Sequence, residues 1–147
     1  MTQDSKDTAL IFDNQICFPL YSAANAMVRV YRPLLKGLDI TYLQYMVLML
    51  LWERNALNVK QLGQQMRLDS GTLTPLLKRL EQKGLVTRSR SKTDERVRVI
   101  AITKEGMVLK KKAKDIPEKL ACKVGLSKPR IKEFNRMCLE LLAFLDD

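Results

Sequence analysis

Apolar side chains recur along residues 17–38 with the spacing of one helix face. Pro19 lies at the start of this segment and fits only in a first turn, because deeper in a helix its ring and missing N–H disrupt the hydrogen-bond ladder. We therefore expect the helix to begin close to Cys17, which places the thiol near the positive end of the helix dipole, where thiolate is favoured. The apolar positions are Leu20, Ala24, Met27, Tyr31, Leu34 and Leu38.

Two capping patterns predict the next two helices. Thr41 with Gln44 predicts a capping box before an apolar helix that runs to about Asn55. Asn58 with Gln61 repeats the pattern and predicts a short helix through Met66.

A third helix start lies at "DSGTLTP", where Asp69 or Ser70 is the cap and Pro75 is expected in the first turn. Gly84 suits the left-handed position after the helix. Two short helices joined by a tight turn predict a helix-turn-helix, and the hairpin expected from residues 85–90 and 97–102 would be its wing. The inner face of the third helix consists of Leu73, Leu76, Leu77 and Leu80.

Two more helices are expected after the hairpin. Thr103 caps a basic helix that Pro117 kinks or ends, and Ser127 with Pro129 begins the last helix. The terminal helices are too apolar on one face for a lone winged helix to cover, so we expect them to pack on a second subunit. The apolar stripe of the last helix is heptad-like and consists of Ile131, Phe134, Met137, Cys138, Leu141, Leu142 and Leu145.

These elements predict a mainly α fold with a small β-hairpin wing, a winged helix-turn-helix dimerised through its N- and C-terminal helices. We expect one domain over residues 1–147, with a DNA-binding lobe at 41–103 and dimerisation helices at 13–38 and 104–146. The longest apolar run, Tyr45 to Trp52, is far shorter than the roughly 20 residues of a membrane span. The N-terminus "MTQDSKD" has no apolar signal core, so we expect a cytoplasmic protein and no membrane partner.

Charge and composition narrow the chemistry. Of the net charge of +10, most lies in residues 67–112, which contain 13 lysines and arginines and five acidic residues. A block this basic favours a polyanion partner, although a solvated charged face is the alternative. The chain has no histidine, which excludes His-based triads and zinc sites, and its three cysteines are too scattered for a metal knuckle. We therefore expect no metal, no cofactor and no enzyme.

The start of the second helix of a helix-turn-helix enters the major groove, and an arginine on a thin wing suits the minor groove. We expect Asp94 to orient Arg96 through an ion pair, unless it only closes the turn. The candidate DNA-contacting residues are Asp69, Ser70, Thr72, Thr74, Lys78, Arg79, Arg88, Arg90, Lys92, Asp94 and Arg96.

"LDSGTLTPLLKRLEQKGLVTR" followed by "DERVRVIAIT" resembles the MarR family of winged-helix repressors. "DNQICFPLYSAANAM" and "DITYLQYMVLMLLWE" are similar, within that family, to the organic hydroperoxide sensors (OhrR). The likeness extends from about Asp13 to Leu145. It implies a homodimeric repressor that binds double-stranded operator DNA and releases it when an organic hydroperoxide reacts with a cysteine.

The resemblance also implies roles for single residues. Cys17 corresponds to the peroxide-reactive thiol, and Tyr31 and Tyr42 correspond to two tyrosines that reach this thiol from the partner subunit. Many members have a second cysteine, here Cys122, that forms an intersubunit disulfide with the first, whereas others are capped by a small thiol. Pro19 departs from the family pattern, in which a residue of ordinary helix propensity is expected at this position.

The residues leave alternatives for each thiol. Cys17 could simply pack, since free cysteine is commonly buried. Cys122 lies off the apolar line of Ile116, Leu120 and Val124, which favours an exposed, reactive thiol. Cys138 lies on the apolar stripe of the last helix and is expected in the core. An apolar peroxide pocket at the dimer interface is expected from Ile16, Phe18, Tyr21, Met46 and Met49.

Three rival functions remain open. The first is a MarR-type repressor relieved by non-covalent small aromatic ligands, with Cys17 incidental. The second is a basic thiol peroxidase, although the chain lacks histidine and has no arginine close to Cys17 in sequence. The third is an architectural DNA binder without a switch.

Overall fold

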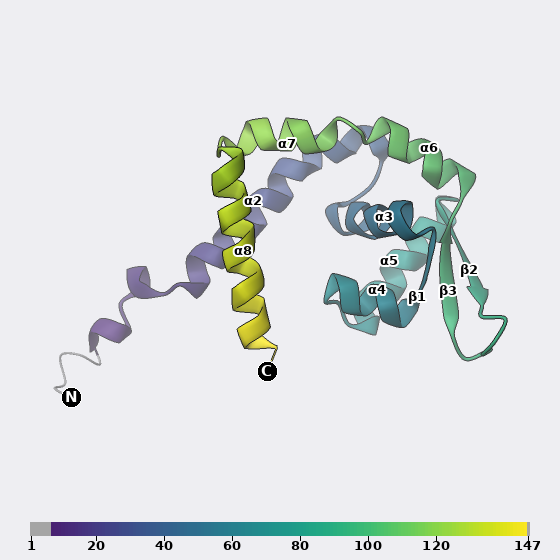
Figure 1. The fold of residues 1–147 in the computed structure, drawn as a ribbon, viewed down its shortest axis with the longest axis horizontal. Coiled ribbons are helices and arrows are strands. Elements are labelled where there is room, and N and C mark those ends of the chain that lie inside the picture. Colours follow the sequence, from purple (N-terminus) through teal and green to yellow (C-terminus); the bar gives the residue numbers. More distant parts are fainter. Residues whose placement is uncertain (1–6, 147) are drawn as a thin grey trace. The chain divides into compact units, whose positions relative to one another are not determined.

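The computed structural model describes residues 7–146. The chain divides into two compact units, residues 1–114 and 115–147. The first unit contains η1 (Phe12–Asn14), α2 (Cys17–Leu35), η2 (Lys36–Leu38), α3 (Tyr42–Arg54), β1 (Ala56–Asn58), α4 (Val59–Met66), α5 (Ser70–Gln82), β2 (Val86–Arg90), β3 (Arg98–Ile102) and α6 (Lys104–Lys112), and the second contains α7 (Ile116–Val124) and α8 (Lys128–Leu145) (Figure 1).

Helix α2 begins at Cys17, as predicted, and Pro19 lies in its first turn. The expected buried stripe is only partly correct, because Ala24 and Met27 are exposed in the single chain, whereas Leu35 is buried. The helix ends at Leu35 and continues as the short 3₁₀ helix η2. Its N-terminal part therefore leaves the apolar side chains of Phe18, Tyr21 and Met27 exposed in the single chain.

Helix α3 is the centre of the first unit, with Tyr45, Val47, Leu48 and Leu51 buried. Its predicted capping box is confirmed: the Thr41 N–H donates to Gln44 Oε1 at 3.0 Å, and the Gln44 N–H donates to Thr41 Oγ1 at 3.4 Å. These reciprocal bonds satisfy two donors that a helix start otherwise leaves unpaired. The position of the α3 start is thus fixed by local sequence.

The helix-turn-helix consists of α4 and α5. Asn58 and Gln61 form the predicted capping box of α4, with N–H to oxygen distances of 2.9 and 2.8 Å. Asp69 caps α5, and Leu73, Leu76, Leu77 and Leu80 are buried on its inner face. The expectation that Pro75 lies in the first turn is wrong: α5 begins at Ser70, so Pro75 falls in the second turn. The hydrogen bond that its nitrogen cannot make would go to Gly71, which is exposed and accessible to water.

The wing is confirmed and is part of a three-stranded antiparallel sheet in the order β1-β3-β2. In the hairpin Val86 pairs with Ile102 and Arg90 pairs with Arg98. The third strand, β1, was not predicted, because three residues between two helices are too short for a period-2 pattern to be recognised. Leu57 of β1 pairs with Ile100 of β3, so the wing is attached to the end of α3.

Helix α6 packs on the same unit as the winged helix. Its cap Thr103 accepts the Gly106 N–H at 3.0 Å and donates its own hydroxyl to the Gly84 carbonyl at 2.7 Å. Thr103 thereby joins the end of α5 to the start of α6. The conformation of Gly84 is left-handed, with φ 71°, as predicted for the residue after a helix end.

In the second unit, Pro117 lies in the first turn of α7. The basic helix α6 therefore ends before Pro117 and is not kinked by it, which is one of the two predicted outcomes. Ser127 is the N-cap of α8 and Pro129 lies in its first turn, as predicted. Within α8, residues 128–145, no side chain is fully buried in the single chain, and Phe134, Met137 and Phe144 are exposed.

Among residues 7–146 no single helix has both the length and the hydropathy of a membrane span. The segments Cys17–Leu38 and Tyr42–Arg54 reach these values only as a pair, bent by 69°.

Candidate nucleic-acid interface and cysteine site

The second helix of the helix-turn-helix, α5, is called here the recognition helix, and the predicted contact residues along it are exposed, whereas its leucines are buried. Asp69 Oδ1 accepts the Thr72 N–H at 2.7 Å, which orients the first turn. Ser70, Thr74 and Lys78 follow at four-residue spacing, so they share one face, and all three are exposed. Thr72 and Arg79 are also exposed. The helix thus presents short hydroxyls at its start and cations about two turns later.

The wing concentrates positive charge. Arg90 and Arg98 are direct cross-strand neighbours and both are exposed. Like charges in this position repel each other, so the pair does not stabilise the hairpin by itself. Arg90 has a distant carboxylate partner, Glu95, at 3.9 Å, and Arg88 pairs with Glu81 of α5 at 3.0 Å. The arginines of the wing thus outnumber the carboxylates that pair with them, and this excess of positive charge favours a negatively charged ligand.

The expected ion pair between Asp94 and Arg96 is wrong in this structure. Asp94 Oδ1 accepts the backbone N–H of Arg96 at 3.0 Å, and its carbonyl accepts the Val97 N–H at 3.0 Å. Within residues 7–146 the two side chains form no ion pair. The carboxylate therefore closes the turn, which was the alternative interpretation, and leaves the Arg96 guanidinium exposed.

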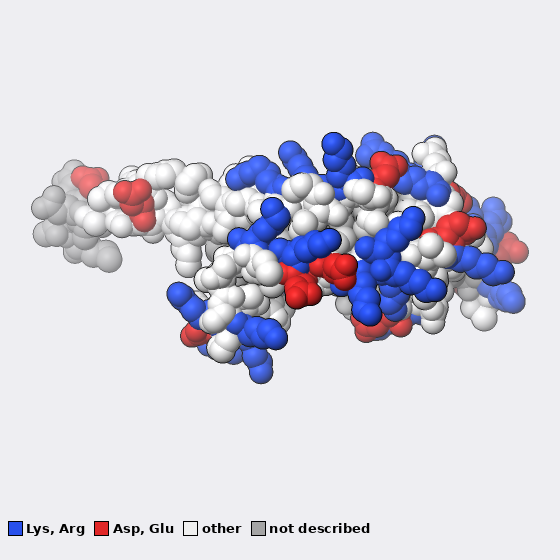
Figure 2. Space-filling model, turned by 90° about the horizontal axis from the view of Figure 1, so that it is seen from above, with Lys and Arg blue, Asp and Glu red and all other residues white. Residues whose placement is uncertain are grey.

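A groove of about 610 Å³ lies between α4, α5 and the wing. It brings together three predicted contact residues, Thr74, Arg88 and Arg96, with Arg98, which the sequence places beside the wing tip, and with Lys60, which the sequence interpretation did not include. Arg98 lies opposite Arg90 in the hairpin. Lys60 follows the cap of α4, and no local sequence pattern indicates its proximity to the wing. Figure 2 shows the wide distribution of lysines and arginines over one face of the molecule.

Cys17 is exposed at the first position of α2. The two residues before Ile16 hold the preceding chain in place: Gln15 Nε2 donates to the carbonyls of Ala9 and Ile11 at 2.6 and 3.0 Å, and Asn14 Nδ2 donates to the carbonyl of Thr8 at 2.9 Å.

The rings of Phe12 and Phe18 lie beside this segment, with centroids 4.5 Å apart. The thiol is thus open to solvent, and its sequence neighbours Ile16 and Phe18 are exposed apolar residues.

Tyr31 and Tyr42, predicted as a pair, do lie together. Their ring centroids are 5.0 Å apart, and Tyr45, which the sequence interpretation did not include, lies 5.8 Å from Tyr31. Burial, followed by the neighbouring phenols of Tyr42 and Tyr45, raises the pKa of Tyr31 to about 12. Burial also raises the pKa of Tyr45. The hydroxyls of Tyr31 and Tyr45 therefore remain protonated at neutral pH and can donate hydrogen bonds.

Within one chain the tyrosines do not meet Cys17. Tyr31 lies 14 positions after Cys17 in the same helix, which corresponds to about 21 Å along the axis. A contact between these groups consequently requires a second subunit.

The remaining predicted site residues can be located in the structure, but they do not come together in one site within the single chain. Ile16, Phe18, Tyr21 and Met49 are exposed and Met46 is half-buried, so the single chain does not close the expected peroxide pocket. Cys122 is exposed on α7, off the apolar line, as expected. Cys138, expected in the core, is only half-buried, because the apolar stripe of α8 is largely open in the single chain.

Comparisons with known proteins agree with this arrangement. A family model described as the transcriptional regulator SarA/Rot matches residues 29–116. The chain is 46% identical over 143 residues to an organic hydroperoxide resistance transcriptional regulator of Bacillus subtilis, with 97% of this chain and 95% of the relative covered.

Two solved structures of AbfR, a protein of Staphylococcus epidermidis, are similar along the chain. Reduced AbfR bound to DNA has a TM-score of 0.79 at 32% identity and covers 97% of this chain and 99% of its own. Disulfide-formed AbfR has a TM-score of 0.61 at 32% identity and covers 99% and 97%. These relatives are regulators and not enzymes, and the predicted winged-helix fold is confirmed. The chain belongs to the MarR-type winged-helix transcriptional regulators and, among them, to the organic hydroperoxide resistance regulators.

Proposed function

We propose that the protein is a homodimeric repressor that binds operator DNA when reduced and releases it after an organic hydroperoxide oxidises Cys17. The observation that supports this most directly is the placement of Cys17, an exposed thiol at the first position of α2, between the exposed apolar residues Ile16 and Phe18 in sequence. A thiol that senses a peroxide has to be accessible, and apolar neighbours favour peroxides with organic substituents. The protein would act in the cytoplasm, where its operator lies.

DNA binding is proposed for α5 and the wing. The exposed Ser70, Thr74 and Lys78 would enter the major groove, and Arg96 on the wing would enter the minor groove. Two such lobes in a dimer would contact half-sites about 34–36 Å apart, one turn of DNA. In agreement with this proposal, a similar structure is described as AbfR bound to DNA.

Dimerisation is proposed for the terminal helices. Residues 14–28 contain no charged side chain, yet Ile16, Tyr21 and Met27 are exposed there. Exposed apolar side chains on α8 add a second surface of the same character. A second copy of the chain would cover both surfaces, and it would also allow Tyr31 and Tyr42 of one subunit to approach Cys17 of the other.

The proposed chemistry is a two-step oxidation. The Cys17 thiolate attacks one oxygen of the hydroperoxide, the O–O bond breaks, and the leaving alkoxide takes up a proton to become an alcohol. The resulting sulfenic acid condenses with the thiol of Cys122 from the other subunit, which forms the disulfide and releases water. Each thiol reacts once, so the process is sensing and not turnover. The new bond would change the spacing of the two lobes and thereby weaken two-headed DNA binding.

The test is a fluorescence-anisotropy titration of the full-length protein against its own upstream intergenic DNA, with and without cumene hydroperoxide. Wild type is expected to release DNA with peroxide and to rebind after dithiothreitol. Cys17→Ser should hold DNA throughout, whereas Cys122→Ser should lose the dithiothreitol-reversible disulfide. Cys138→Ser is the matched control and should behave as wild type. Release by Cys17→Ser equal to that of wild type would contradict the thiol mechanism.

A second candidate is relief by a small aromatic ligand without covalent chemistry. A cavity of about 710 Å³ between α2 and the start of α3 supports it, because apolar side chains line it together with Arg32, Lys36 and Tyr42. An aromatic carboxylate would suit such a lining. Salicylate that releases DNA equally from wild type and Cys17→Ser would favour this candidate.

A further inference from the structure

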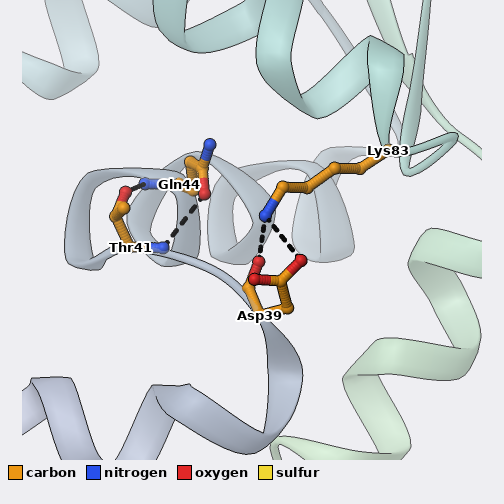
Figure 3. A network of polar contacts seen from close by, with 4 residues as sticks. All are labelled: Asp39, Thr41, Gln44 and Lys83. Atoms are coloured by element: carbon orange, nitrogen blue, oxygen red, sulfur yellow. Dashed lines mark hydrogen bonds and ion pairs between the residues drawn. The ribbon is translucent and has the colours of Figure 1, made fainter.

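Lys83, which directly follows the recognition helix α5, extends to the connection between α2 and α3 (Figure 3). Its ammonium group donates to the backbone carbonyl of Asp39 and lies 3.0 Å from Asp39 Oδ2. At the same time the Lys83 N–H bonds to the Arg79 carbonyl at 3.1 Å, which closes α5. One residue thus ends the recognition helix and binds a segment 44 positions earlier in the chain.

That segment, residues 36–41, is called here the α2–α3 joint. Asp39 has the left-handed conformation, with φ 53° and ψ 43°, and its N–H donates to the Lys36 carbonyl at 3.1 Å. Aspartate tolerates this conformation better than most residues. Ile40 is buried, and Thr41 is held by the capping box with Gln44 (Figure 3). The Asp39 carbonyl therefore cannot move unless η2 and the start of α3 move with it.

The contact adds little to stability. The Asp39 side chain is 93% exposed, and ion pairs in such positions are weak because water screens them. The bond to the backbone carbonyl has an acceptor that the chain itself holds in place, whereas the carboxylate belongs to an exposed side chain. The contribution of Lys83 is thus mainly geometric.

We infer that Lys83 is a positioning residue for DNA recognition, which attaches the C-terminal end of α5 to the α2–α3 joint so that the direction of α2 sets how α5 meets the DNA. Cys17 lies at the opposite end of α2. A movement of α2 caused by oxidation of Cys17 would therefore reach the recognition helix through Lys83. This second part rests on the proposed function. The first part does not depend on it.

The experiment compares the full-length wild type with Lys83→Met, which keeps the side-chain length but removes the donor. Dissociation constants are measured for operator DNA and for a scrambled duplex of equal length. Lys83→Met should weaken operator binding about tenfold and scrambled binding no more than about twofold. A loss of stability, or the loss of one charge, would weaken both alike, so the ratio of the two constants isolates positioning.

Two controls sharpen the comparison. Lys83→Arg keeps a donor that can reach the carbonyl, and it should restore the ratio to within about threefold of wild type. Lys112→Met removes the same charge from the exposed end of α6 and should leave the ratio unchanged. An unchanged ratio in Lys83→Met, or equal losses in Lys83→Met and Lys112→Met, would overturn the inference.

A peroxide arm tests the second part. The release factor, which is the operator dissociation constant after cumene hydroperoxide divided by that before, should fall at least threefold in Lys83→Met, on the order expected for lost coupling. An unchanged release factor would refute the passage of oxidation through Lys83. If wild type itself does not respond, the proposed function fails, and the operator-to-scrambled ratio alone still decides the role of Lys83.

Discussion

The indole N–H of Trp52 donates to the backbone carbonyl of Gly106 over 2.8 Å. A second bond joins the same two helices in the opposite direction, because Lys110 Nζ donates to the Trp52 carbonyl over 3.2 Å. These two bonds join α3 to α6, and Gly106 lies directly against the chain between α5 and β2. The position of α6 on the first unit therefore depends on a close backbone approach as well as on apolar contact.

Gly106→Ala tests this approach. An added Cβ would overlap the Leu85 carbonyl oxygen and lie 2.5 Å from Ile102 Cδ1, so backbone and side chains would have to shift. We expect the free energy of unfolding to fall by about 2 kcal/mol, measured by urea denaturation. Gly37→Ala is the control, because a Cβ there meets nothing within 4 Å, and it should change stability by less than about 1 kcal/mol. Equal losses in both variants would argue against tight packing at Gly106.

Asp69→Ala should destabilise the recognition helix. It removes the acceptor of the 2.7 Å bond from the Thr72 N–H, which costs about 1 kcal/mol at an N-cap. Asp69→Asn keeps an acceptor and should lose only a few tenths. Thermal unfolding followed by circular dichroism measures both. The capping role would be disproved by an alanine variant as stable as the asparagine variant.

Arg96→Ala tests the wing as a phosphate or minor-groove contact. Since the Arg96 guanidinium has no carboxylate partner in the described chain, its charge is available to DNA. We expect weaker binding and a salt dependence whose slope, log Kd against log salt concentration, falls by about 1. Arg130→Ala on α8 removes an equal charge and should leave the slope intact. A slope unchanged by Arg96→Ala would exclude the wing tip from the interface.

The half-buried Tyr31 should make the stability of the protein depend on pH in the alkaline range. The pKa of Tyr31 in the folded protein, about 12, lies above its ordinary value of 10.0, so the folded state binds the phenol proton more tightly than the unfolded state does. The resulting stabilisation is present below pH 10 and is lost as the pH rises from 10 to 12.

Tyr31→Phe should therefore flatten the decline of the melting temperature above pH 10. Tyr21→Phe, at a side chain 69% exposed, should keep the wild-type profile. Identical profiles for wild type and Tyr31→Phe would show that Tyr31 titrates normally.

Local signals in the sequence were enough for much of the fold. The caps at Thr41, Asn58, Asp69 and Thr103 depend on residues three positions apart, so the sequence contains both partners of each bond. The leucine face of α5 follows from helix periodicity alone. The helices of a winged helix-turn-helix could therefore be predicted from these local signals alone.

Contacts distant in sequence were not predictable in the same way. Nothing near Lys83 indicates Asp39, and Tyr45 joins Tyr31 only because α2 and α3 pack together. Asp94 shows the opposite difficulty, since an ion pair with Arg96 and a turn bond to its backbone have the same sequence spacing. Only the coordinates distinguish the two.

The cross-strand neighbours Arg90 and Arg98 give the wing an unusual response to ionic strength. In the free protein, added salt screens their repulsion and should make the hairpin more stable. In the complex with DNA, the same salt competes with the wing for phosphates and should promote dissociation. A higher salt concentration in the cell would thus stabilise the fold of this hairpin and at the same time weaken its binding to DNA.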